Sequence, residues 1–457
     1  MKNLLSLSLS AAITISGFGH AAAQTQIIST VAGNGVFYTP MCDVGDGSPA
    51  TTSFANEIPS LAFDASGNML IVDKECHNIR EVNTSGILST IIGNGVFGFG
   101  DGGPATAGNI NWPTYILNDG SGNFYISDQG EGRIRKINTA GILSTVAGTV
   151  YGGIPSGDGG PATAAVLNAP MGMAMDPAGN LLIVDAARVR KVNTTTGIIT
   201  TIAGGGTGGD GIPATAASLG TGYDVGGVAV DAAGNIYISG NDRIRKVNTS
   251  GIISTIAGGG SVLGDGGPAT AAMLSYPVDM KFDTHGNLFI ADQHNERIRM
   301  INTSGIISTV AGTGVPGYSG DGGAATAAKL SAPAGLAFDA AGNLYIADDS
   351  NSVVRKLSPN LTLAVTPVTA AMQHIDLFPN PTTGSLNITG SLNSTGDQNV
   401  ALEVTNLLGQ VVYKNTIAVQ HGIISTQVQL NGIPSGIYLL HLAGESENEV
   451  LRFSVNK

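Results

Sequence analysis

Short apolar stretches separated by turn residues run through most of the chain. One unit shows the pattern clearly, with apolar stretches at 280–283, 288–292, 297–301 and 306–312. Gly, Asn, Asp or Ser stands between them, as is typical of β-strands joined by tight turns. The pattern predicts four short strands in this unit.

The same unit recurs along residues 27–358. Its marker is Gly-Asp-Gly-x-Pro/Ala-Ala-Thr, which begins at Gly45, Gly100, Gly157, Gly209, Gly264 and Gly320, at spacings of 55, 57, 52, 55 and 56 residues. A fixed period of this kind indicates one structural unit repeated in an array. The sequence therefore contains six copies of a four-stranded unit.

The two ends of the array complement each other. Residues 27–33 resemble a fourth strand that arrives before any first strand, whereas the last unit, 336–357, has three strands and lacks a fourth. An open solenoid would not need this offset, but a ring closed by its own termini would. We therefore predict an all-β fold with a six-bladed β-propeller of four strands per blade, in which the N-terminal strand closes the last blade.

The repeat resembles the NHL family. The resemblance rests on Gly-Asn-Leu-Tyr-Ile-Ala-Asp at 342–348, Asn-Glu-Arg-Ile-Arg-Met-Ile at 295–301 and Ile-Ser-Thr-Val-Ala-Gly at 307–312, with counterparts in all six units. It implies a propeller over residues 24–358. It also implies an alternative function, because some related propellers are lyases or lactonases with a central metal held by His, Glu or Asp.

An inserted loop of about twenty residues precedes each first strand, and its Ala-rich part predicts one to two helical turns after a Pro. Each loop carries one Asp, and a second Asp follows the second strand of most units. One reading of the loop Asp is calcium or polar-ligand binding, and the other, which we favour, is that the Asp caps the short helix or bonds the Gly-Gly backbone. The candidate residues on the binding face are Asp46, Asp101, Asp158, Asp210, Asp265 and Asp321 in the loops, and Asp128, Asp185, Asp292 and Asp348 after the second strands.

Composition narrows the class of function. The chain has 66 glycines among 457 residues, 12% charged residues and a formal net charge of −12. These values fit many turns and argue against a coiled coil or a nucleic-acid-binding protein. Few histidines or glutamates fall in the repeats, and no catalytic constellation or metal-ligand set is visible. We predict no catalytic residues and no cofactor, with calcium kept as an alternative.

The N-terminus predicts export. Residues 1–23 have a basic Lys2, a short apolar run and an Ala-x-Ala exit, as a secretory signal peptide does, and no later stretch is apolar enough to span a bilayer. Export places Cys42 and Cys76 where a disulfide persists. Because both cysteines fall in loops expected on the same face, we predict that they pair.

The C-terminal part of the chain predicts a second targeting signal. After a linker at 359–373, alternating strands predict a small Ig-like β-sandwich over 374–457. This part resembles the C-terminal sorting domain of the type IX secretion system of Bacteroidetes, in the blocks 378–384, 406–412, 433–439 and 453–457. The matching residues include Phe378, Pro379, Asn380, Pro381, Gly384, Gly409, Gly436, Tyr438 and Lys457.

Together these features predict an exported, non-catalytic binding module. The resemblance implies that the type IX secretion machinery is one partner and that the protein is secreted or held at the outer surface of a Gram-negative bacterium. The partner of the propeller face is a protein or glycan that the sequence does not identify. The alternative is a secreted lyase-like or lactonase-like enzyme with a metal in its central channel.

Overall fold

The computed structural model describes residues 26–36, 42, 45–53, 56–93, 100–149, 152–220, 225–359, 373–391, 397–406, 411–443 and 448–456. The chain divides into two compact units, residues 1–360 and 361–457. The predicted signal peptide, most of the predicted linker, Gly409 and Lys457 lie outside the described residues.

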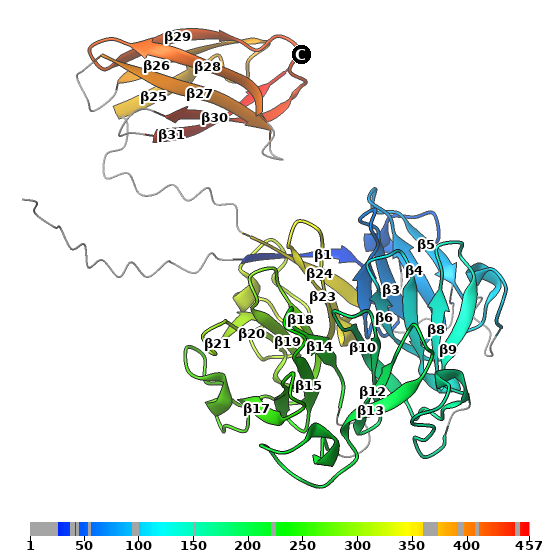
Figure 1. Cartoon of the computed structure of the whole chain (residues 1–457). Coiled ribbons are helices and arrows are strands. Elements are labelled where there is room, and N and C mark those ends of the chain that lie inside the picture. Colours follow the sequence, from blue (N-terminus) through cyan, green and yellow to red (C-terminus); the bar gives the residue numbers. More distant parts are fainter. Residues whose placement is uncertain are drawn as a thin grey trace, which may run out of the picture. The chain divides into compact units, whose positions relative to one another are not determined.

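The first unit is built from four-stranded antiparallel sheets (Figure 1), six of them among the described residues. The first three sheets contain β2 (Leu61–Phe63), β3 (Met69–Asp73), β4 (Asn78–Val82) and β5 (Leu88–Ile92); β6 (Pro113–Asn118), β7 (Phe124–Asp128), β8 (Arg133–Ile137) and β9 (Leu143–Ala147); and β10 (Pro170–Met175), β11 (Leu181–Asp185), β12 (Arg188–Val192) and β13 (Ile199–Gly204). The next two contain β14 (Val228–Val230), β15 (Ile236–Gly240), β16 (Arg243–Val247) and β17 (Ile253–Gly258); and β18 (Pro277–Phe282), β19 (Leu288–Asp292), β20 (Arg297–Ile301) and β21 (Ile307–Ala311).

The sixth sheet joins the two ends of the repeat array. It contains β22 (Pro333–Phe338), β23 (Leu344–Asp348) and β24 (Val353–Pro359), and its fourth strand is β1 (Gln26–Ala32). β1 runs antiparallel to β24, with Ile28 opposite Leu357 (Figure 1). The sequence offset therefore corresponds to a sheet assembled from both termini of the array.

The first strands of the six sheets contact one another in a cycle. β2 contacts β6, β6 contacts β10, β10 contacts β14, β14 contacts β18, β18 contacts β22, and β22 contacts β2. The approach is close, since a Cβ on Gly172 would lie 2.7 Å from the carbonyl oxygen of Gly226, and one on Gly335 would lie 2.6 Å from Cα of Ser60. Small residues at these positions therefore let the first strands meet around a common centre.

The hairpin between the first and second strands is built on a recurring Asp. In the fifth sheet, Oδ1 of Asp283 accepts hydrogen bonds from the backbone N–H groups of His285 and Asn287, both within 2.9 Å. Gly286 takes a φ of 83° in this turn, which glycine adopts without steric cost. The same carboxylate-to-backbone pattern recurs at Asp64, Asp119, Asp176, Asp231 and Asp339.

In the described part of each inserted loop, the Ala-rich segment forms a short 3₁₀ turn rather than a longer α-helix. In the fifth sheet the turn is η7 (Ala269–Ala271), preceded by Pro268, and the others are η1 (Ala50–Thr52), η2 (Ala105–Ala107), η4 (Ala162–Ala164), η5 (Ala214–Ala216) and η9 (Ala325–Ala327). These six turns have no side-chain cap. The expectation that the loop Asp caps a helix is therefore wrong; the carboxylate has another partner, described below.

The second unit contains two antiparallel sheets. The three-stranded sheet has the order β25 (Gln373–Phe378), β26 (Ser385–Ser391), β29 (Ile423–Gln429), and the four-stranded sheet has the order β28 (Val411–Val419), β27 (Gln398–Asn406), β30 (Gly436–Ala443), β31 (Asn448–Val455). A buried core that includes Leu386, Val404, Leu440 and Phe453 draws on both sheets. The alternation of buried and exposed residues along β26 and β30 supplies this core.

Candidate functional site

Each loop Asp forms an ion pair with a buried Arg on the third strand of its sheet. The Asp side chains are 42–45% exposed, and the N···O distances are 2.6–2.7 Å. The six pairs are Asp46–Arg80, Asp101–Arg135, Asp158–Arg190, Asp210–Arg245, Asp265–Arg299 and Asp321–Arg355. The loop carboxylates thus hold the inserted loops on the sheets.

The Asp that ends the second strand lies beneath the loop and contacts the same Arg from inside. The carboxylates of Asp128, Asp185, Asp292 and Asp348 are completely buried and lie 2.9–3.3 Å from the guanidinium nitrogens. Asp73 does the same in the first sheet, at 3.8 Å from Arg80. These residues are therefore not on a binding face; we call each set an Asp–Arg–Asp cluster.

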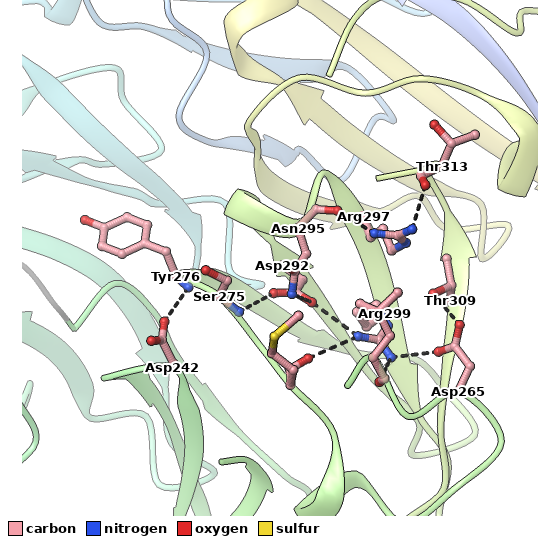
Figure 2. A network of polar contacts seen from close by, with 12 residues as sticks. Asp242, Asp265, Ser275, Tyr276, Asp292, Asn295, Arg297, Arg299, Thr309 and Thr313 are labelled. Carbon is pink, nitrogen blue, oxygen red and sulfur yellow. Dashed lines mark hydrogen bonds and ion pairs between the residues drawn. The ribbon is translucent and has the colours of Figure 1, made fainter. Parts of the chain in front are cut away.

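Figure 2 shows the cluster of the fifth sheet. Arg299 lies between Asp292 at 3.3 Å and Asp265 at 2.7 Å, and Thr309 donates to the second oxygen of Asp265 at 2.7 Å. Asp292 also accepts the backbone N–H of Ser275 at 2.8 Å. Both oxygens of both carboxylates are therefore engaged within the protein.

The fourth sheet departs from this pattern. Gly240 stands where the other sheets have the inner Asp, and Arg245 pairs with Asp210 alone among the carboxylates. Its remaining hydrogen bonds go to the carbonyl oxygens of Ser218 and Gly209, both at 2.9 Å. This sheet therefore contains a half cluster.

Burial raises the pKa of inner carboxylates such as Asp128, whereas for the outer carboxylate Asp101 burial is outweighed by hydrogen bonding, which lowers the pKa. Burial raises the pKa of Asp128 to about 7 and of Asp348 to about 6, with Arg135 and Arg355 only partly offsetting it. For Asp101, burial also raises the pKa, but hydrogen bonds from Thr145 and Arg135 more than offset it and leave the pKa lowered. In the second sheet the partly exposed Asp101, rather than the buried Asp128, is thus the carboxylate held in its charged form.

The two cysteines form a disulfide. Cys42 and Cys76 are bonded, with their Cα atoms 5.2 Å apart and a sequence separation of 34. Next to Cys76, the Nδ1 atom of His77 accepts the backbone N–H of Trp112 on the following sheet at 3.0 Å. Burial lowers the pKa of His77, which favours the neutral ring that can accept this hydrogen bond.

A cavity of about 270 Å³ lies at the start of the first strands. Its wall takes at least one residue from the first strand of each sheet or from the segment just before that strand, including Pro59, Thr114, Met171, Gly226, Val278 and Ala334. Because the first strands contact one another in a cycle, a cavity lined by all six lies at the centre of the unit. It is the candidate binding site.

Polar residues that follow the second strands form the rim of this cavity. Lys74, Gln129, Gln293 and Asp349 all line it, and Lys74 forms an ion pair of 2.6 Å with Glu57. Oδ1 of Asp349 is buried without a hydrogen-bond partner among the described residues. Burial and the nearby Glu57 raise the pKa of Asp349 to about 7, which Lys74 partly opposes.

Tyr115 and Asp279 lie at the inner end of the cavity. The hydroxyl of Tyr115 on β6 donates to Oδ1 of Asp279 on β18 at 3.0 Å, and the side chain of Lys281 donates to both residues. Oδ2 of Asp279 accepts the backbone N–H of Leu336 at 2.9 Å. Tyr115 and Asp279 are 4% and 3% exposed, so the carboxylate is paired out of contact with bulk water, whereas the side chain of Lys281 is 28% exposed.

Sequence reasoning missed the cavity residues and the clustered Arg. An Arg at one position of the third strand recurs in all six units, in four of them as the second Arg of Arg-x-Arg, and this was a usable signal for a partner of the Asp. The sequence signal for the cavity residues is weaker. Tyr115 and Asp279 occupy the repeat position at which three other units have Gly172, Gly227 and Gly335.

The described residues offer little for a metal. Within the part of the chain that the structure describes, no three His, Cys, Asp or Glu side chains converge as a metal site would require. Each loop Asp contributes one carboxylate that already accepts from a guanidinium. Hard cations such as calcium gather several oxygen ligands at once.

In the second unit, the predicted sorting residues meet the C-terminal strand. Oδ1 of Asn380 accepts the backbone N–H of Ser454 at 3.0 Å, and Thr382 donates its backbone N–H to the carbonyl oxygen of Ser454 at 2.8 Å. Tyr438 packs in the core and donates its hydroxyl to the carbonyl oxygen of Pro434 at 2.9 Å. The Phe-Pro-Asn-Pro block and the C-terminal block are thus parts of one structure.

Among the described residues of the chain, no helix is long and apolar enough to span a membrane.

Comparisons with known proteins give the relatives of both units. Residues 376–456 match the secretion system C-terminal sorting domain, and residues 154–208 match the Teneurin NHL domain. Teneurin-4 of Homo sapiens is 29% identical over 282 residues, covering 52% of this chain and 10% of the relative. Teneurin-1 of Homo sapiens is 27% identical over 380 residues, covering 74% of this chain and 13% of the relative. The chain thus spans only 10–13% of the length of these two relatives.

Solved structures resemble the first unit in fold. A structure described as an auxiliary nutrient binding protein from Bacteroides ovatus superposes with a TM-score of 0.54 at 17% identity, covering 74% of this chain and 77% of that chain. One with the same description from Bacteroides thetaiotaomicron gives a TM-score of 0.53 at 16% identity, covering 73% and 76%. The chain therefore carries NHL-type repeats in a propeller-like body of four-stranded blades, followed by a type IX C-terminal sorting domain that directs export to the cell surface or the medium.

Proposed function

We propose that this protein is an exported, non-catalytic binding module that holds a small polar ligand in the central cavity of a closed six-bladed propeller. In this proposal the propeller covers residues 24–358, and an Ig-like β-sandwich over 374–457 serves the secretion machinery alone. The cavity wall supports the first part, because it includes residues from the first strand of each of the six sheets or from the segment just before it. Central sites of this kind are a common place for ligands in folds built around an axis.

The size and lining of the cavity support a small, polar ligand. Its volume of about 270 Å³ lies just below the usual range of drug-sized pockets. Two amide side chains, Gln129 and Gln293, and the carboxyl of Asp349 stand at the rim, and Tyr276 supplies an aromatic wall. Such a set suits a ligand with several hydroxyl or amide groups, whether a free solute or the terminal residue of a glycan.

The carboxyl of Asp349 supports a ligand that donates a hydrogen bond. Its Oδ1 has no partner among the described residues, and leaving a buried acceptor unpaired costs about 1–3 kcal/mol. A ligand hydroxyl or amine would remove this cost on binding. A buried carboxyl oxygen without a donor thus favours ligands that bring one.

The descriptions of two structural neighbours agree with a binding role, although the likeness is one of fold. Both are called auxiliary nutrient binding proteins, at 16–17% identity. The Asp–Arg–Asp clusters explain the recurring carboxylates as loop anchors, so the proposal no longer needs them as ligands.

A ligand panel tests the proposal. The full-length secreted protein would be screened by thermal shift against neutral monosaccharides and disaccharides, amino acids and nucleosides, and hits would be titrated by calorimetry. Trp112 is the one tryptophan of the chain, is half exposed and lies one residue before β6, so its fluorescence gives a second readout. A saturable hit that Gln293→Ala weakens supports the proposal; a hit that Gln293→Ala and Asp349→Ala both leave unchanged would contradict it.

A further inference from the structure

Two strands on opposite sides of the cavity are joined by side chains. β6 and β18 are three contacts apart in either direction around the cycle of first strands, yet the hydroxyl of Tyr115 reaches Asp279 at 3.0 Å. No other pair of first strands that lie opposite each other shares a side-chain hydrogen bond among the described residues. The contact therefore crosses the centre of the unit.

The composition of one repeat position makes this crossing possible. One position of the repeat lies three residues before the end of each first strand. Four sheets have a small residue there, namely Ser60, Gly172, Gly227 and Gly335. The second sheet has Tyr115 at this position and the fifth sheet has Asp279. The glycines place no side chain at the centre of the unit. Tyr115 alone brings a large ring into that space.

Lys281 reaches the same point from beyond the cavity. It stands two residues further along β18 than Asp279, where the other sheets have Ala62, Leu117, Ala174, Ala229 and Ala337. It does not line the cavity, yet its ammonium group lies 2.9 and 3.1 Å from the two oxygens of Asp279 and also donates to Tyr115. The ring of Tyr115 and the carboxyl of Asp279 thus separate the cavity from the lysine.

The three polar groups satisfy one another. Asp279 accepts from Tyr115, from Lys281 and from the backbone of Met280 and Leu336, so neither oxygen lacks a donor. Burial lowers the pKa of Lys281, but the charge of Asp279 more than offsets it and leaves the pKa raised, so the lysine stays charged. Burial and the same carboxylate raise the pKa of Tyr115, so its hydroxyl stays protonated. The inner end of the cavity is therefore polar but has no unpaired charge to offer a ligand.

From this geometry we infer that Tyr115 is a specificity-determining residue: with Asp279 and Lys281 it forms a closed floor that gives the central cavity one open end and sets its depth. The inference rests on the proposal that the cavity is the binding site. In this inference the rim residues recognise the ligand, and the floor limits how long a ligand can be. Removing the Tyr115 side chain should extend the site by the volume of one phenol ring.

The test uses 4-methylphenol, which corresponds to the whole tyrosine side chain and so contains the hydroxyphenyl group that Tyr115→Ala removes. In Tyr115→Ala the new gap is continuous with the cavity, and Asp279 and Lys281 are left without their shared partner. We expect saturable one-to-one binding of 4-methylphenol to this variant by calorimetry, and at least about tenfold weaker binding to the wild type. We also expect Asp279→Asn in the Tyr115→Ala background to weaken binding by about tenfold, which corresponds to about 1.4 kcal/mol.

Tyr125 provides the matched control. It is also 4% exposed and lies on the neighbouring strand β7, but it does not line the cavity. Tyr125→Ala should show no comparable binding at the same concentrations. Equal binding to the two Ala variants, or no binding to Tyr115→Ala, would overturn the inference. Neither result bears on the ligand panel for the native cavity, so the failure of one proposal can be told from the failure of the other.

A second variant keeps the inference testable if Tyr115→Ala does not fold. No free cysteine is present among the described residues, so Tyr115→Cys introduces a single reporter thiol. If Tyr115 is the floor of an open-ended cavity, methyl methanethiosulfonate should modify this thiol at least about tenfold faster than the thiol of Tyr125→Cys. Equal rates for the two thiols would overturn the inference.

Discussion

The hydroxyl of Tyr115 lies 3.0 Å from Oδ1 of Asp279 and ties the second sheet to the fifth across the centre of the propeller-like unit. Lys281 completes the contact by donating to both residues. Recurring Asp–Arg–Asp clusters hold the loops that surround this centre. The repeats thus build a regular frame, and a few departures from the repeat build the candidate site.

The first prediction concerns the cross-cavity hydrogen bond. Tyr115→Phe removes the hydroxyl but keeps the ring, and it should lower the free energy of unfolding by about 1.5–3 kcal/mol, because the bond involves a buried charged partner. Chemical denaturation with matched urea series would measure it. Tyr125→Phe is the control, and a loss as large there would show that the bridge has no special role.

The second prediction uses the half cluster of the fourth sheet. Arg299→Met leaves Asp292 buried without its cation and should cost about 3–5 kcal/mol, as the breaking of buried ion pairs does. Arg245→Met should cost about 1–2 kcal/mol, because Gly240 leaves no inner carboxylate and Asp210 is 43% exposed. Equal costs in the two sheets would contradict the role assigned to the inner Asp.

The third prediction concerns calcium. Oδ1 of Asp265 pairs with Arg299 and Oδ2 accepts from Thr309, so the carboxylate has no oxygen to give without losing a bond. Millimolar calcium should leave the melting temperature unchanged within about 1 °C, and equilibrium dialysis should detect no bound ion. A calcium-dependent rise that Asp265→Asn abolishes would restore the metal reading of these loops.

The fourth prediction concerns pH. Asp349 has its pKa raised from an ordinary 3.8 to about 7, so the folded protein keeps a proton that the unfolded chain releases at lower pH. The free energy of unfolding should therefore fall as pH rises from about 4 to about 7. In Asp349→Asn that part of the slope should disappear. An unchanged slope in the variant would show that Asp349 titrates normally.

The fifth prediction concerns the disulfide. Cys42 and Cys76 close a loop with a sequence separation of 34, for which chain entropy suggests a stabilisation of about 3–4 kcal/mol. The double variant Cys42→Ala/Cys76→Ala should lose this amount in denaturant titrations. Reduction of the wild type should give a similar loss, and a protein indifferent to both treatments would contradict the prediction.

Much of the frame was predictable because it repeats. The strands, the Asp-based hairpins and the pairing of β1 with β24 follow from local turn chemistry and from the offset between the ends of the array. The role of the loop Asp was misjudged, because its partner, Arg299 in the fifth sheet, lies 34 residues away and on another strand. Patterns between residues close in sequence favour a helix cap for this Asp, and they carry no information on an ion pair with a residue far along the chain.

The candidate site was not predictable in the same way. The hydroxyl of Tyr115 and the carboxyl of Asp279 are 164 residues apart, and only the closing of the ring brings them together. Their signal in the sequence is a departure from Gly or Ser at one position of the repeat. Its meaning depends on knowing that this position faces the centre.

The most direct test of the account fills the cavity. Ala334 lies on its wall, so Ala334→Phe would occupy the space, whereas Ile154→Phe alters an inserted loop where the side chain is 84% exposed. Calorimetry with the strongest hit of the ligand panel should show one site in the wild type and in Ile154→Phe, and at least about 100-fold weaker binding in Ala334→Phe. Equal affinity in all three proteins would contradict the claim that the central cavity is the binding site.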